Sequence, residues 1–181
     1  SFGAKVFVEA WKGFAGQKNS AMDKASMDWV LQLDADESLE PGLAAEIEVA
    51  LKGDSPLKGF WIPRKNYFLG RWIRHGGFYP DPKLRLIRRG AGRFEEYGAH
   101  PTIKVDGPTG TLSHALIHNA YPTLRGYLDH MNSYSSMGAE VALAKGYRRF
   151  SVTNIVLRPL LTFIYNYFFR LGFLDGREGL L

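Results

Sequence analysis

The sequence predicts an α/β protein: a mostly parallel sheet flanked by helices, followed by C-terminal helices. Two observations lead to this prediction. Strand-like and helix-like segments alternate over residues 4–51, as they do where parallel strands are joined by helices. One of these strands ends in a cluster of acids, and open α/β sheets hold their ligands at the carboxyl ends of strands. We therefore divide the chain into residues 1–120 and a helical segment, residues 121–181.

Four elements are expected in the first part. Residues 4–9 alternate and are β-branched, so they predict a strand. Residues 13–25 place their apolar side chains where one side of a helix can hold them. Residues 29–33 are apolar and predict a short buried strand. Residues 41–51 predict a helix with proline in its first turn and Gly53 just beyond its end.

The pattern becomes irregular after residue 56. Residues 59–63, 84–88 and 102–105 are short strand candidates, separated by loops rich in glycine, aromatic and basic residues. We expect them to be built onto the first sheet. A helix then follows over residues 121–145, with Thr123 as its N-cap and a glycine at its end.

Residues 151–174 are apolar and aromatic, but Arg158 and Arg170 interrupt them. The stretch between these arginines is too short for a membrane-spanning helix, which needs about 20 apolar residues. Two interpretations stay open: a helix lying in a membrane interface, or a helix packed on the core of the domain.

Composition restricts the function further. The chain has 181 residues, a formal net charge of +5 and no cysteine. The charge favours anionic partners, and the lack of cysteine excludes disulfides and thiolate metal sites. Residues 1–10 show no signal peptide. The chain lacks an initiating methionine and opens almost directly on a predicted strand, so we expect it to be a fragment of a longer protein.

The acid cluster is Asp34, Asp36 and Glu37, directly after the strand at residues 29–33. Carboxylates this close repel one another and are costly to desolvate unless a cation neutralises them. Mg²⁺ typically binds one or two carboxylates together with substrate phosphates. The cluster therefore favours a metal site that bridges the protein to a diphosphate. The alternative is a solvated loop whose polar side chains cap the next helix.

Four segments together resemble the family 2 glycosyltransferases of the GT-A fold: Gly3–Asn19, Trp29–Glu37, Gly77–Leu86 and Gly172–Gly176. The resemblance covers most of the chain and is greater to the branch that adds sugars to lipopolysaccharide core. It implies a Rossmann-like GT-A sheet whose N-terminal strand and helix precede this chain. It also implies inverting, metal-dependent transfer of a sugar from a nucleotide-sugar to a glycolipid, by a peripheral protein on the cytoplasmic face of the bacterial inner membrane.

The resemblance also implies roles for donor-site residues. Asp34 and Asp36 would bind Mg²⁺ or Mn²⁺ and the diphosphate of the donor. Glu37 would tune this site or contact the sugar. Lys18 would meet a phosphate or the nucleotide, and Asn19 would fix the loop or the sugar.

Enzymes of this fold often add a late histidine to the metal, and His118 fits that place. His114 lies four residues earlier and would share a side with His118 on a helix or on a strand. An ordinary packed histidine is the alternative for either residue.

The catalytic base is the hardest assignment. Related enzymes carry an acid directly after a histidine, whereas residues 98–101 read Gly-Ala-His-Pro and offer proline there. We therefore expect Glu95 or Glu96 to accept the proton of the acceptor hydroxyl, with Asp81 next. An acid that is merely solvated or paired with a base, such as Arg93, is the alternative.

A basic and aromatic stretch over residues 61–93 favours a phosphorylated glycolipid acceptor, because aromatic faces stack on sugars and arginines bind phosphates. Its basic members are Arg64, Lys65, Arg71, Arg74, Lys83, Arg85, Arg88, Arg89 and Arg93. The same mixture would suit single-stranded nucleic acid, so a nucleic-acid-binding module is one alternative function. A non-catalytic remnant of the fold is another. A phosphoryl-transfer enzyme is less favoured, because no glycine-rich phosphate loop is present.

Overall fold

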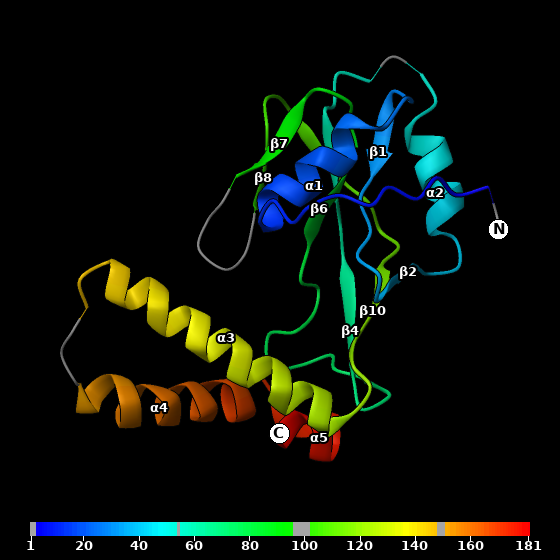
Figure 1. Cartoon of the computed structure of the whole chain (residues 1–181). Helices are drawn as coiled ribbons and strands as arrows, with labels where there is room; N and C mark the ends of the chain where they lie inside the picture. The colour runs from blue at the N-terminus through cyan, green and yellow to red at the C-terminus, as the bar shows by residue number, and fades with distance from the viewer. Residues whose placement is uncertain (1–2, 54, 96–101, 148–150) are drawn as a thin grey trace.

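The structure is a computed structural model that describes residues 3–53, 55–95, 102–147 and 151–181. Strands occupy the middle of the molecule, and the two longest C-terminal helices project away from them (Figure 1). The predicted α/β class is confirmed.

Five α-helices are described: α1 (Phe14–Asp23), α2 (Leu43–Ala50), α3 (Leu124–Ala144), α4 (Arg158–Ile164) and α5 (Gly176–Leu180). Two π-helical turns, Thr153–Leu157 and Tyr165–Phe169, flank α4, and a 3-10 turn covers Gly172–Asp175. The strands are β1 (Trp29–Leu31), β2 (Glu37–Leu39), β3 (Gly59–Ile62), β4 (Arg64–Phe68), β5 (Arg71–Trp72), β6 (Lys83–Arg88), β7 (Gly92–Glu95), β8 (Thr102–Val105), β9 (Thr109–Thr111) and β10 (Leu116–Tyr121).

The strands form three small sheets, ordered β1-β6-β3-β9, β2-β10-β4-β5 and β7-β8. Within the described residues only the pairs β10–β4 and β3–β9 are parallel, and the other pairs are antiparallel. The expectation of a mostly parallel sheet is therefore not met. Strands β1 and β3, which α2 connects, do run in the same direction. The later strand β6 lies between them and is antiparallel to both.

The predicted strand at residues 4–9 is wrong. These residues are irregular, and Val6 and Val8 are 85% and 94% exposed. A strand requires a hydrogen-bonded neighbour. None of the described strands pairs with this segment. The alternating pattern therefore reflects a local preference for extended backbone, but no described strand pairs with these residues.

Helices α1 and α2 pack against two different hydrophobic clusters that β6 connects. The cluster on the α2 side is Leu43, Phe60, Ile62, Leu86, Leu112 and Leu116. The cluster on the α1 side is Ala15, Met22, Leu84, Ile87 and Phe94. Strand β6 contributes to both clusters, so it is the central strand that holds the two helices in place. The predicted helices at residues 13–25 and 41–51 are confirmed.

The C-terminal helices begin as expected. Thr123 is the N-cap of α3, and its hydroxyl accepts a hydrogen bond from the Gly126 amide at 3.1 Å. Neither α3 nor α4 contains a buried residue. None of the helices in the described part of the chain is both long and apolar enough to cross a membrane. Residues 151–174 are helical over most of their length, with α4 as the central part.

Candidate functional site

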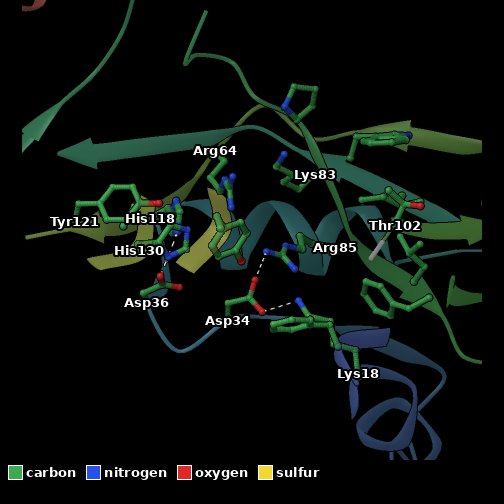
Figure 2. A pocket seen from close by; sticks show the side chains of 18 residues that line it. Lys18, Asp34, Asp36, Arg64, Lys83, Arg85, Thr102, His118, Tyr121 and His130 are labelled. Carbon is green, nitrogen blue, oxygen red and sulfur yellow. Dashed lines mark hydrogen bonds and ion pairs between the residues drawn. The ribbon is translucent and has the colours of Figure 1, made fainter. Parts of the chain in front are cut away.

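Asp34 and Asp36 of the acid cluster line a cavity of about 730 Å³, which Figure 2 shows from close by. Lys18 from α1 and Asp34 from the turn after β1 lie on one side of it. Asp36 and His118 face each other at another part of the wall. Arg85 from β6 points between these two groups. Two of the three predicted acids therefore lie beside a cavity of the size that holds small ligands.

Asp34 is held by two cations. Its Oδ1 accepts a hydrogen bond from Lys18 Nζ at 2.7 Å, and its Oδ2 accepts one from Arg85 Nη2 at 2.6 Å. Partial burial acts to raise the pKa of Asp34, but Lys18 and Arg85 outweigh it and lower this pKa to about 2. Asp34 is therefore an anionic anchor for two basic side chains, with both oxygens occupied.

Arg85 is a site residue to which the sequence gave no role beyond the basic stretch. Strand β6 has an irregularity here, because Phe60 pairs with Leu86 and Trp61 already pairs with Leu84. A bulge of this kind redirects the side chain of the extra residue. Arg85 is only 6% exposed, and Nη2 also contacts Glu37 Oε1 at 2.7 Å. The acids Glu37 and Asp34 overcome the effect of burial and raise the pKa of Arg85.

Glu37 lies beneath this network and is buried. Its Oε1 also accepts a hydrogen bond from Arg64 Nη1 at 3.2 Å, and its Oε2 accepts one from the Asp34 amide at 3.1 Å. Of the two roles expected for Glu37, these contacts match tuning of the site, because its oxygens are engaged by protein groups.

Asp36 is the member of the acid cluster that is still available to a ligand, and it faces His118. His118 Nε2 lies 3.3 Å from Asp36 Oδ2, and His118 Nδ1 lies 2.7 Å from Asn66 Oδ1. The Asn66 amide nitrogen donates to Asp81 and to the Phe78 carbonyl, so Asn66 Oδ1 is an acceptor and His118 carries its proton on Nδ1. Burial, together with the charge of Arg64, lowers the pKa of His118.

Two other predicted residues have local partners. The side chain of Asn19 accepts from the Phe94 amide at 2.8 Å and donates to the Phe94 carbonyl at 2.9 Å, so it fixes β7 against α1. Asn19 thus holds a strand and not a loop, and the two roles that the resemblance implied for it stay predictions. His114 contacts Glu46 at 2.9 Å and is not beside His118. The expected shared side of the two histidines is wrong, because His114 lies before β10 and not within it.

The candidate bases differ in their surroundings. Asp81 accepts from Arg64 Nη2 and Lys83 Nζ, both at 2.8 Å, and lines a second cavity of about 1080 Å³. Burial acts to raise its pKa, but Lys83, Asn66 and Arg64 outweigh this and lower it. Glu95 is 60% exposed, lies 3.7 Å from Lys104, and lines neither cavity. Glu96 and residues 98–101 lie outside the described residues.

Comparison with known proteins gives the chain its relatives. It is 29% identical over 174 residues to the lipopolysaccharide core biosynthesis glycosyltransferase LpsC of Rhizobium meliloti (strain 1021), covering 95% of this chain and 62% of that protein. It is 26% identical over 191 residues to an uncharacterized glycosyltransferase of Rickettsia typhi, covering 99% and 65%. The chain is related to glycosyltransferases. No family model matches it.

A third glycosyltransferase relative, from Rickettsia bellii, is 50% identical over 48 residues, which is 26% of this chain and 16% of that protein. The predicted resemblance to glycosyltransferases with a link to lipopolysaccharide core is confirmed by these names. The chain spans less than two thirds of the length of the first two relatives. Membership of family 2 and the GT-A sheet stay predictions.

The basic stretch of this glycosyltransferase relative is mostly neutralised by its own acids. Six of its nine basic residues pair with carboxylates: Arg64, Lys65, Arg71, Lys83, Arg85 and Arg93. Four of these cations, Arg64, Arg71, Lys83 and Arg85, pair with an acid that lines one of the two cavities. This arrangement offers fewer free charges to a phosphate backbone than the sequence suggested.

Proposed function

We propose that this chain carries the donor site of a glycosyltransferase that moves a sugar from a nucleotide-sugar to a glycolipid acceptor of the lipopolysaccharide core type, with inversion and with Mg²⁺ or Mn²⁺ as cofactor. The names of the relatives support the transferase class. The observation that carries the proposal is the facing pair Asp36 and His118 in the cavity of about 730 Å³.

The chemistry of this pair fits a divalent cation. With its proton on Nδ1, His118 presents the lone pair of Nε2 toward the carboxylate of Asp36, so two acceptors face each other at 3.3 Å. A cation between them would remove this repulsion. Imidazole and carboxylate are both ligands for Mn²⁺, and Mg²⁺ accepts few protein ligands when phosphates complete its shell. When bound, the metal would neutralise the charge that develops on the departing diphosphate.

Asp34 does not take the role of second metal ligand that the resemblance implied for it. Lys18 and Arg85 occupy its two oxygens, so it positions these cations at the edge of the cavity. From there Lys18 and Arg85 bind the diphosphate of the donor through charge-assisted hydrogen bonds. Asp34 could join the metal only if a phosphate drew these cations away from it.

Asp81 is the best-placed acid to accept the proton of the acceptor hydroxyl. Arg64 and Lys83 keep Asp81 ionised. Asp81 also lines the second cavity, which His118, one of the proposed metal ligands, lines as well. The hydroxyl oxygen, as its proton moves to Asp81, attacks the anomeric carbon from the side opposite the diphosphate, which inverts that centre. Glu95 and Glu96 stay predictions for the same role.

The test of the proposal is binding of a nucleoside diphosphate in the presence of Mn²⁺, measured by calorimetry on the complete protein. Asp36→Asn should weaken Mn²⁺-dependent binding about 10–100-fold, the range seen when the support of a metal site is damaged. Asp129→Asn is the matched control, because Asp129 is 72% exposed on α3 and lines neither cavity. Equal affinities for wild type and Asp36→Asn would contradict the metal assignment.

A further inference from the structure

The second cavity, about 1080 Å³, adjoins the donor-site cavity. Arg64, His118 and Tyr121 line both of them, so the two cavities meet beside His118, one of the two proposed metal ligands. The second cavity is as large as the larger pockets that hold small ligands, which run to about 1,000 Å³. A molecule in it could therefore reach the reacting centre.

The wall of this cavity is largely apolar and comes from both parts of the chain. The lining comes from strands β4 and β10, from the loop after β5, and from helices α3, α4 and α5. Its apolar side chains include Phe68, Ile73, Phe78, Met131, Phe163 and Leu180. An apolar lining of this extent favours a hydrocarbon ligand, because water gains nothing from contact with it.

Polar groups gather where the cavity approaches the proposed metal ligands. Arg64 and Asp81 form an ion pair there. His75, on the same lining, is fixed by Asp175, whose Oδ1 lies 2.9 Å from His75 Nδ1 and whose Oδ2 accepts from the amides of Arg74 and His75. The cavity is therefore amphipathic. The Arg64–Asp81 pair lies where it adjoins the donor site, apolar side chains make up most of the remaining lining, and Asn154, Arg158, Asn166 and Glu178 add polar groups from the helical region.

The helices that form the apolar wall also carry uncovered apolar residues. Leu160 and Leu161 on α4 are 52% and 53% exposed, and Phe169 in the turn after it is 75% exposed. Pro159, Thr162 and Phe163 of the same helical stretch line the cavity. The cavity is thus bounded by helices whose remaining apolar surface is suited to a lipid bilayer.

We propose that this second cavity binds the hydrocarbon chain of the acceptor lipid, with the sugar or other hydroxyl-bearing head at Arg64 and Asp81. The identity of the occupant as the acceptor rests on the proposed transferase function. The inference restricts the acceptor to lipids whose sugar-accepting hydroxyl lies close to the hydrocarbon chain, because both must fit in the same cavity.

The first experiment measures binding of monomeric n-alkyl glucosides, from hexyl to nonyl, to the complete protein by calorimetry without vesicles. Each methylene that enters the cavity should raise the affinity up to about fourfold, the factor for a fully buried methylene. Affinity that does not change with chain length would overturn the proposal.

Two matched pairs of variants on α4 locate the binding. Thr162→Trp fills the cavity and should weaken nonyl glucoside at least tenfold, whereas Leu161→Trp, one residue away and outside the lining, should leave binding unchanged. The second pair removes apolar area: Phe163→Asn should weaken binding, because Phe163 lines the cavity, whereas Leu160→Asn should leave binding unchanged. Loss of folding is not expected, since these four residues are exposed. Equal effects within each pair would show that the chain binds elsewhere.

A further variant tests the orientation of the head. Asp81→Asn removes a charged acceptor from the polar end and should weaken nonyl glucoside about tenfold, as for the loss of one charged hydrogen bond. Unchanged affinity would place the head toward solvent and overturn the acceptor assignment. These outcomes are independent of Mn²⁺-dependent nucleoside diphosphate binding. Failure of that assay alone would overturn the proposed function, and failure here alone would overturn this inference.

Discussion

The strand body (residues 14–121) and the helical region (residues 124–181) are stabilised in different ways. The body buries its own core, with Leu43, Ile62 and Leu116 fully inaccessible, and pairs most of its acids with bases. In the helical region α3 and α4 bury no residue, and the main buried contact is that of Asp175 with the loop after β5. The body is therefore preorganised, whereas the helical region leaves large apolar side chains exposed.

A core truncation should give the largest effect and should depend on the region. Leu43→Ala removes a side chain with no exposed area, so we expect a loss of about 2–5 kcal/mol in the free energy of unfolding. Leu160→Ala, on exposed α4, should change it by less than about 0.5 kcal/mol. Urea denaturation of the complete protein measures both. Similar losses would contradict the contrast between the two regions.

Breaking the anchor between the regions should have the next largest effect. Asp175→Asn weakens a buried acceptor that two amides and His75 share, so we expect about 1–3 kcal/mol of destabilisation. Limited proteolysis should then cut the helical region before the body. Asp129→Asn, on an exposed part of α3, should leave the cleavage pattern unchanged. Simultaneous cleavage of both regions would mean that they unfold as one unit.

Membrane binding would sharpen the comparison at the surface. Residues 151–174 should bind anionic vesicles without spanning them, and Arg158→Gln should lower partitioning about fivefold, as expected for about 1 kcal/mol per basic residue near such a surface. The matched control is Arg88→Gln, an exposed position in the body. Vesicle co-sedimentation at low and high salt is the measurement, and binding should fall as salt rises. Equal losses for both variants would show a diffuse charge effect.

The smallest effect should come from the pH dependence within the body. The pKa of Asp34 falls from 3.8 to about 2 on folding, so its ion pairs stabilise the folded state above about pH 4 and lose that contribution as the pH falls through about 2. Asp34→Asn should cost less than about 1 kcal/mol at pH 6, because the side chain is 36% exposed. The difference from wild type should disappear near pH 2 in urea unfolding. A constant difference across this range would contradict the lowered pKa.

Local signals in the sequence were sufficient for several elements. Thr123 predicted the start of α3, and the apolar residues 29–33 predicted β1, because capping and periodicity act over a few positions. The acid cluster after β1 pointed to the cavity for the same reason. The pattern at residues 4–9 was as strong, yet no described strand pairs with it.

Local patterns along the chain were enough to specify the helices and the place where the acids cluster. Which of these acids are free depends on long-range contacts: Arg85 and Lys18 occupy Asp34, while Asn66 orients His118 toward Asp36. The same contacts set β6 antiparallel between β1 and β3, and they bring Asp175 to the amide of His75, 100 residues away, on the lining of the second cavity. The two kinds of feature differ in the sequence range of the interactions that determine them. Caps and periodicity depend on neighbours along the chain, whereas strand pairing and ion pairs depend on which distant segments the core brings together.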